Sequence, residues 1–200
     1  MSSVELYLDP ICPFAWVTSR WLLAAAADTG REVTLRQMSL AVLNENREMD
    51  PAQQAKMGRS RRIGRMFAAA VATGEPGAFT ELYEALGTQI HAGGRELTDS
   101  VVNEALASCG ADPKLADALD DPSWDDAVRT SHHRSQDLLG GEGGSPILVV
   151  GDVGFFGPVL TSLPDPDAGT ALLDAVVTAA STPGFAVLQR PYQGPPSIQR

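Results

Sequence analysis

The residues best suited to chemistry lie together near the start of the chain, in the stretch Asp9-Pro10-Ile11-Cys12-Pro13-Phe14-Ala15-Trp16. An apolar strand candidate, Val4–Leu8, precedes it, and a helical pattern follows to about Asp28. We therefore predict that Cys12 lies at a helix N-terminus, with Pro13 in the first turn, where its missing N–H group would have no partner. The helix dipole and the free backbone N–H groups favour a thiolate there. They can lower a thiol pKa from about 8.5 to roughly 3.5–7.5, which predicts a nucleophilic cysteine.

Two features of this stretch leave alternatives open. A free cysteine is often only a small buried apolar residue, and that interpretation also fits Cys12. Ala15 stands where a Cys-x-x-Cys motif has its second cysteine. The stretch therefore predicts a site with one thiol, which either works with a small thiol from solution or does no redox chemistry.

The elements that position Cys12 alternate between strand and helix. The strand Val4–Leu8, the helix from Pro13 to Asp28 with Gly30 as its C-cap, and the alternating segment Glu32–Met38 predict a βαβ unit with parallel strands. Near the other end of the chain we predict a hairpin, a closing helix and an extended tail, over residues 145–156, 167–180 and 183–200.

The middle of the chain has helical periodicity and no β-rich run. Leu40–Arg47 is predicted to be a loop, and helices are predicted over 52–73, 76–90, 98–108, 112–119 and 123–139. The chain is thus expected to have an α/β fold in which residues 45–139 form an all-helical insertion between two halves of a core, residues 1–44 and 140–200.

Several other reactive side chains have ordinary explanations. Cys109 precedes Gly110 at the end of an amphipathic pattern, which favours a packed structural cysteine. His132 and His133 are adjacent, so on a helix they point about 100° apart and form no metal pair. With no ligand-spaced cysteine pair or carboxylate, we predict no metal site. His91 either faces a cleft or caps a helix C-terminus.

A basic run stands out in an acidic chain. One interpretation is a solvated helix face balanced by the acidic segment at residues 117–126, and the other is a rim that attracts an anionic substrate or favours the Cys12 thiolate. The run comprises Lys56, Arg59, Arg61, Arg62 and Arg65.

Composition excludes several functional classes. The formal net charge of −10 argues against nucleic acid as the main partner. No apolar run is long enough to span a bilayer, and the N-terminus lacks the basic and apolar regions of a secretory signal. Two cysteines among 200 residues make no disulfide framework, so we expect a cytoplasmic protein.

In several segments, taken in order along nearly the whole chain, the sequence resembles DsbA-like thioredoxin-fold proteins. The resemblance is closest to their actinobacterial cytoplasmic branch, the mycothiol-dependent nitroreductase or FrnE-like group. The segments are Asp9-Pro10-x-Cys12-Pro13-x-x-Trp16, Thr18–Trp21, Met38–Leu40, Leu43–Arg47, Ile90-His91, Ser131–His133, Ser145-Pro146 and Phe155–Leu160.

This resemblance implies a thioredoxin-like core with a helical insertion and a cleft between them. It implies that Cys12 is the attacking cysteine and that Pro13 and Pro146 belong to the catalytic site, with Pro146 as a cis-proline. From the sequence alone a trans Ser145–Pro146 bond would be favoured, because only about 5–6% of X–Pro bonds are cis. The cleft would be lined by Asp9, Phe14, Trp16, Asn44, His91 and Ser145.

The resemblance also implies the partners. No cofactor would be tightly bound, mycothiol or a similar small thiol would be the co-substrate, and a disulfide or small electrophile would be the substrate of a monomer or homodimer. Because Ala15 replaces the second cysteine, release of a mixed disulfide on Cys12 would need the external thiol.

Two other functional classes stay open. One is an enzyme like kappa-class glutathione transferases or 2-hydroxychromene-2-carboxylate isomerases, which would retain activity after Cys12→Ser. The other is a redox-inactive binding or chaperone-like module, which a Cys12 pKa near 8.5 would support.

Overall fold

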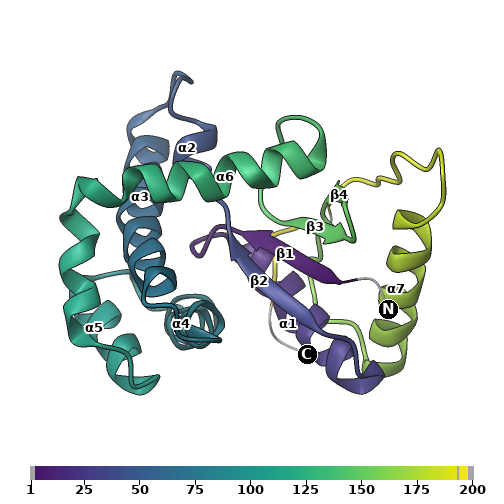
Figure 1. The fold of residues 1–200 in the computed structure, drawn as a ribbon, viewed down its shortest axis with the longest axis horizontal. Coiled ribbons are helices and arrows are strands. Elements are labelled where there is room, and N and C mark those ends of the chain that lie inside the picture. The colour runs from purple at the N-terminus through teal and green to yellow at the C-terminus, as the bar shows by residue number, and fades with distance from the viewer. Residues whose placement is uncertain (1–2, 193, 198–200) are drawn as a thin grey trace.

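A four-stranded sheet lies at the centre of the computed structural model, which describes residues 3–192 and 194–197 (Figure 1). The sequence predictions for residues 1–2, 193 and 198–200 fall outside this range. The strand order is β2-β1-β3-β4; β1 is parallel to β2, and the other two pairs are antiparallel. The predicted parallel pair and the predicted hairpin are therefore confirmed. The strands are β1 (Val4–Leu8), β2 (Val33–Gln37), β3 (Ile147–Val150) and β4 (Val153–Phe156).

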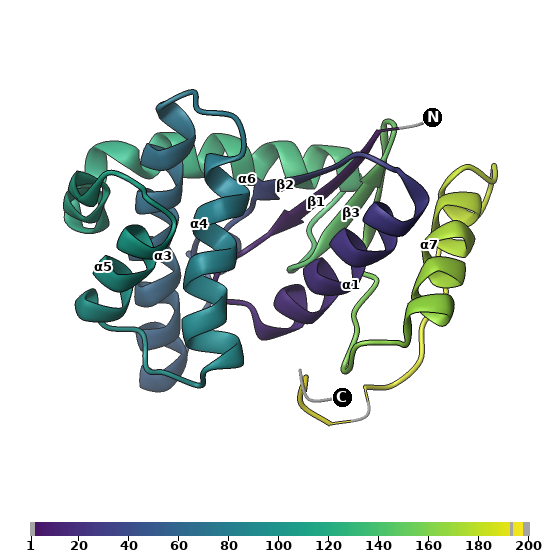
Figure 2. The same ribbon diagram turned by 90° about the horizontal axis from the view of Figure 1, so that it is seen from below.

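Helices cover both faces of this sheet. Figure 2 shows α1 (Pro13–Thr29) and α7 (Pro166–Ala180) on one face and α6 (Asp125–Leu139) on the other. The indole N–H of Trp21 in α1 donates to the carbonyl of Gly169 in α7 at 2.8 Å, which joins the two helices. Fully buried apolar side chains of the strands fill the layer between sheet and helices, because each strand has an apolar face that must leave water.

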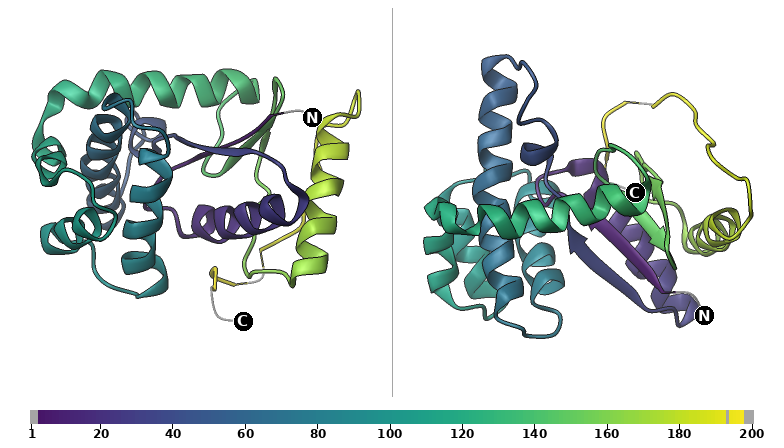
Figure 3. Two further views of the ribbon diagram at one scale, coloured as in Figure 1. Left: turned by 60° about the horizontal axis from the view of Figure 1, so that its bottom comes forward. Right: turned by 45° about the horizontal axis from the view of Figure 1, so that its top comes forward.

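Other long helices pack beside the sheet (Figures 1 and 3). They are α3 (Pro51–Ala72), α4 (Ala78–Gly87) and α5 (Asp99–Ser108). Two 3₁₀ segments, Pro113–Asp120 and Pro122–Trp124, lead from α5 to α6. Because α6 packs on α3 and also across β2, β3 and β4, the last part of the predicted insertion covers the sheet as well. The boundaries at residues 45 and 139 stay a prediction.

Three local predictions differ from the structure. Leu40–Leu43 is a one-turn helix, α2, rather than part of a loop, and the hydroxyl of Ser39 caps it by accepting from the N–H of Val42 at 3.2 Å. Periodicity cannot reveal so short a helix. The helix predicted over residues 76–90 ends at Gly87, and a π-helical turn, Thr88–Ala92, follows it. The helix predicted over residues 112–119 is a 3₁₀ helix.

None of the helices within the described ranges combines the length and the apolar character needed to cross a bilayer.

Helix α6 buries one of its two adjacent histidines. His132 is 4% exposed and its Nδ1 accepts from the backbone N–H of Ser39 at 3.5 Å, whereas His133 is exposed. Burial, with a smaller contribution from the charge of His133, lowers the pKa of His132 to about 4.

We expect the free energy of unfolding to fall as the pH drops from about 6.5 to 4. In this window the imidazole of the unfolded chain binds a proton and that of the folded chain does not, so protonation favours unfolding. The lowered pKa of His132 corresponds to a loss on the order of 3 kcal/mol. Urea unfolding at several pH values measures it. His132→Asn should remove most of this dependence and His133→Asn should preserve it; equal behaviour of the two variants would contradict the assignment.

Candidate functional site

Three chain segments meet at one end of the sheet and form the candidate site. Strands β1 and β2 are parallel, so the residues after Leu8 and after Gln37 leave the sheet at the same edge. Strand β3 is antiparallel to β1 and pairs Ile147 with Tyr7, which brings Ser145 and Pro146 to that edge as well. The topology therefore places the loop that carries Cys12 beside the Ser145–Pro146 loop.

Cys12 is the N-cap residue of α1, as predicted, and Pro13 is in the first turn. The Cys12 N–H donates to the carbonyl of Asp9 at 2.9 Å, and its own carbonyl accepts the N–H of Trp16 at 3.1 Å. The thiol faces Ser145, with Sγ 3.5 Å from the carbonyl oxygen of that residue. The Ser145–Pro146 peptide bond is cis, and so is Gly157–Pro158.

The predicted lowering of the Cys12 pKa is wrong. The side chain is only 6% exposed, and this burial raises the pKa of the thiol because a buried thiolate loses its hydration. The backbone N–H groups of Ala15 and Phe14 and a contact with Ser145 act in the opposite direction but are outweighed, and the Asp9 carboxylate adds to the rise. The helix N-terminus does stabilise the thiolate, but sequence position could not reveal how deeply the sulfur is buried.

Asp9, which the resemblance places in the lining of the cleft, is buried at the start of the Cys12 loop. It is 1% exposed, and its carboxylate accepts hydrogen bonds from the Ser60 hydroxyl at 2.5 Å and from the N–H groups of Leu40 and Ile11 at 2.7 and 3.0 Å. Its own N–H donates to the Ser145 hydroxyl at 2.9 Å. Burial raises the pKa of Asp9, and these donors oppose the rise. Asp9 thus joins the surrounding loops, while Ser60, which no sequence motif indicated, is its side-chain partner.

His91 reaches the site from the π-helical turn. Its Nε2 lies 2.9 Å from the carbonyl oxygen of Pro10, and since a carbonyl only accepts, Nε2 carries the proton. Its ring stacks on Trp16 at 5.6 Å, and burial lowers the pKa of His91, which keeps the ring neutral. Trp16 also packs edge-on against Tyr83, at 5.5 Å. His91 therefore contacts the Cys12 loop, and the alternative of a helix cap is not needed to explain it.

Phe14 and Asn44, two further residues of the predicted cleft, contact different parts of the chain. The ring of Phe14 lies 5.5 Å from that of Tyr192 in the C-terminal tail, a contact that the sequence did not indicate. The side-chain amide of Asn44 donates to the carbonyl of Leu40 at 2.8 Å and lies 3.8 Å from the sulfur of Met57. These contacts hold Asn44 at the end of α2.

No second thiol replaces the missing one at this site. Ala15 is fully buried against the core. Cys109 caps α5 in the helical part of the chain, where its thiol contacts the carbonyl of Leu106, and both cysteines are free. Cys12 is therefore the one cysteine at this site.

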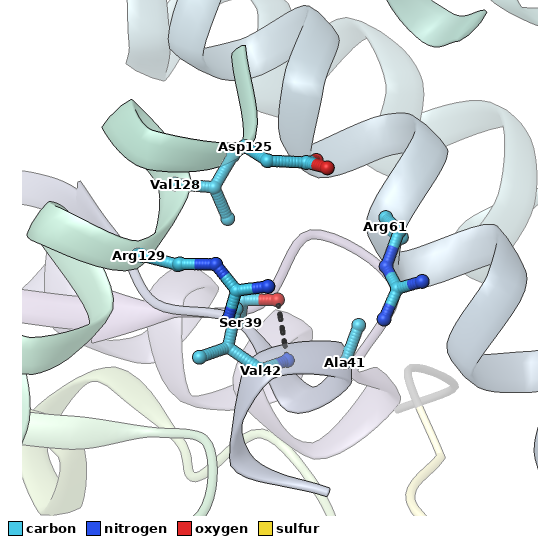
Figure 4. Close-up of a pocket in the computed structure, with 7 residues that line it drawn as sticks. All are labelled: Ser39, Ala41, Val42, Arg61, Asp125, Val128 and Arg129. Carbon is cyan, nitrogen blue, oxygen red and sulfur yellow. Dashed lines mark hydrogen bonds between the residues drawn. The ribbon is translucent and has the colours of Figure 1, made fainter. Parts of the chain in front are cut away.

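Two residues of the basic run, Arg62 and Arg65, form ion pairs. Arg62 bonds Asp120 through two nitrogens and contacts Asp99, and Arg65 bonds Asp125. For these two arginines the prediction of a helix face balanced by acidic residues is confirmed. A small pocket between α2, α3 and α6 has Arg61 and Arg129 on opposite sides (Figure 4), but the Cys12 loop takes no part in it. Within residues 3–192 and 194–197, no three His, Cys, Asp or Glu side chains gather as metal ligands.

Known proteins resemble this chain in sequence and in fold. An uncharacterized protein of Mycobacterium tuberculosis, Rv2286c, is 34% identical over 199 residues, which cover 96% of this chain and 83% of that protein. The probable DsbA oxidoreductase SCO1869 of Streptomyces coelicolor has a similar structure, with a TM-score of 0.60 and 22% identity over 94% of both chains. The cytosolic disulfide reductase DsbM of Pseudomonas aeruginosa, solved with GSH, gives a TM-score of 0.54 and 18% identity over 88% of this chain and 99% of that one.

The two solved structures show the fold, which is the DsbA-like thioredoxin fold with helices inserted. Residues 11–190 match the Rv2466c-like family, described as mycothiol-dependent nitroreductase Rv2466c. This match includes Cys12, the cis Ser145–Pro146 loop and, among the described residues, every helix from α1 to α7. The chain therefore belongs to the Rv2466c-like family of DsbA-like thioredoxin-fold proteins.

Proposed function

We propose that this protein is a cytoplasmic thiol-dependent oxidoreductase in which Cys12 is the one working cysteine and a mycothiol-type small thiol is the co-substrate. The supporting observation is the Cys12 sulfur itself, at the start of α1 and 3.5 Å from the Ser145 carbonyl oxygen. The family description adds mycothiol as the thiol. We propose that Phe14, Trp16, His91 and Ser145 surround the bound thiol and substrate.

The proposed chemistry has two exchange steps. The Cys12 thiolate attacks one sulfur of a substrate disulfide, so that a Cys12–substrate disulfide forms and the other sulfur leaves as a thiolate, which takes a proton from water. The small thiol, as its thiolate, then attacks the substrate sulfur of this mixed disulfide. A disulfide between small thiol and substrate forms, and the Cys12 thiolate is released. One substrate sulfur is thus reduced and the small thiol is oxidised, without a second protein cysteine.

The raised pKa of Cys12 predicts an alkaline pH dependence for the first step. Below its pKa, the thiolate fraction grows about tenfold for each pH unit, so the rate of Cys12 modification should still increase above pH 8. Iodoacetamide labelling between pH 6 and 10, followed by peptide mass spectrometry, measures this rate. A plateau reached already near pH 6 would show a thiol with a lowered pKa instead.

A Cys12→Ser variant tests the proposed function directly. Incubation of the wild-type protein with mycothiol disulfide should give a mixed disulfide on Cys12 that excess mycothiol removes. In Cys12→Ser both this adduct and disulfide reductase turnover should be lost, while Cys109→Ser should retain at least half of the activity. Labelling of Cys109 alone would overturn the proposal, and turnover retained in Cys12→Ser would favour an isomerase or transferase in which the cofactor thiol is activated by another residue.

A redox-inactive binding module is the second candidate. The deep burial of Cys12, its raised pKa and Ala15 favour it. Such a module would bind the small thiol reversibly, as titration calorimetry would detect, and would form no adduct with mycothiol disulfide at any pH up to 10.

A further inference from the structure

The carboxylate of Asp9 is a junction between the helical part of the chain and the Cys12 loop. One oxygen, Oδ1, accepts the N–H of Ile11 inside that loop. The other, Oδ2, accepts the N–H of Leu40 at the start of α2 and the hydroxyl of Ser60 in α3. Since Asp9 is 1% exposed, the residue has almost no contact with solvent, and its position is set by these donors.

Ser60 is the side chain that completes this junction. It is 1% exposed, donates to Asp9 at 2.5 Å and accepts the N–H of Ala41 at 3.1 Å, so its hydroxyl is bonded in both directions. Ser60 therefore links the middle of α3 to Asp9 and to the start of α2 at the same time.

The main chain of Asp9 carries the link onward to the thiol. Its carbonyl accepts the N–H of Cys12 at 2.9 Å, and its N–H donates to the Ser145 hydroxyl at 2.9 Å. The carbonyl of the same Ser145 lies 3.5 Å from Cys12 Sγ. A shift of Asp9 would thus change both sides of the contact between the thiol and the cis-proline loop.

We propose that Ser60 is a positioning residue for the Cys12 site, acting through the Asp9 carboxylate to hold the Cys12 loop against the Ser145–Pro146 loop. The importance of Ser60 for turnover rests on the proposed function. Its effect on the position and reactivity of the Cys12 thiol does not, so an experiment can contradict one of these two claims and leave the other standing.

The charged surroundings of Asp9 give the direction of the expected effect. The Asp9 anion is favoured by its three donors and by the charge of Lys56, one turn before Ser60 on α3. This anion disfavours the Cys12 thiolate and also raises the pKa of the buried Tyr83 hydroxyl. Loss of the Ser60 hydroxyl would let Asp9 keep a proton more often and would loosen the loop that buries Cys12. Both changes favour the thiolate. The neutral ring of His91, bonded to Pro10, adds no charge.

Ser60→Ala in the full-length chain tests the proposal, with Ser135→Ala as the matched control. Ser135 is also a fully buried helical serine, but its hydroxyl donates within α6, to the carbonyl of His132. The measurement is the pH profile of Cys12 alkylation by iodoacetamide, resolved from Cys109 by peptide mass spectrometry. Ser60→Ala should move the midpoint at least half a pH unit downward, which is roughly a threefold faster reaction at pH 7, while Ser135→Ala should leave the midpoint unchanged even if it lowers the melting temperature.

Ser60→Thr keeps the hydroxyl and separates its role from packing. This variant should retain the wild-type midpoint even if the added methyl group lowers the melting temperature. A wild-type midpoint in folded Ser60→Ala, or a shifted midpoint in Ser60→Thr, would overturn the positioning role. If Ser60→Ala does not fold, Asp9→Asn takes its place, because it removes the charge of the carboxylate through which Ser60 acts, and a wild-type midpoint in that variant would overturn the role. Failure of the mycothiol adduct to form in the wild-type protein would overturn the proposed function but leave these results standing.

Discussion

Replacing Gly87 with alanine is expected to lower the free energy of unfolding by about 3 kcal/mol, because the new methyl group would occupy the place of an indole ring. A Cβ atom on Gly87 would lie 2.2 Å from Cζ3 and 2.4 Å from Cε3 of Trp16, where ordinary contacts are 3.4 Å or more. Trp16 is 3% exposed and lies between Tyr83 and His91, so the ring has no space to move into. Urea unfolding followed by tryptophan fluorescence measures the loss.

The same chain offers a matched control for this variant. Gly58 also lies in a helix interior, in α3, but a Cβ there would meet nothing within 4 Å. Gly58→Ala should therefore stabilise the protein by about 0.5–1 kcal/mol, the ordinary gain of alanine over glycine in a helix. Similar losses in both variants, or none in Gly87→Ala, would show that the close packing on Trp16 is not a constraint. Since His91 stacks on Trp16 and bonds Pro10, Gly87→Ala should also change the rate of Cys12 alkylation.

Replacing Asp9 with alanine is expected to cost about 3 kcal/mol or more. The change leaves three donors without their acceptor, namely the buried Ser60 hydroxyl and the part-buried N–H groups of Leu40 and Ile11. Each such unpaired group costs roughly 1–3 kcal/mol. Part of this sum is offset because the variant no longer buries a carboxylate, which is itself unfavourable. Thermal and urea unfolding report the total.

Two further variants, Asp9→Asn and Asp50→Ala, serve as comparisons for Asp9→Ala. Asparagine keeps one acceptor oxygen, so Asp9→Asn should lose less stability than Asp9→Ala, and removal of the negative charge should speed Cys12 alkylation at pH 7. Asp50 is an exposed carboxylate that caps α3 by accepting the N–H of Gln53, and its removal should cost about 1 kcal/mol. An Asp9→Ala variant no less stable than Asp50→Ala would contradict the role of Asp9 as a buried junction.

Much of the fold could be predicted because its signals are local. The strand Val4–Leu8, the proline in the first turn of α1, and the left-handed Gly30 at its end are encoded within a few residues of one another. The same holds for the parallel pair and the hairpin. The short α2 and the π-helical turn at Thr88–Ala92 were missed because one turn is too short to carry a period.

The sequence by itself determined the candidate nucleophilic atom and its place in the fold, namely one cysteine at the start of α1, with no second thiol at Ala15. Only the tertiary structure decided how that atom behaves. The burial that raises the pKa of Cys12 depends on the whole core. The bond between Asp9 and Ser60 joins residues 51 positions apart, and the bond between His91 and Pro10 joins residues 81 positions apart. No local pattern encodes such contacts, because they form only when distant helices and strands pack, and packing sets the desolvation of each buried group.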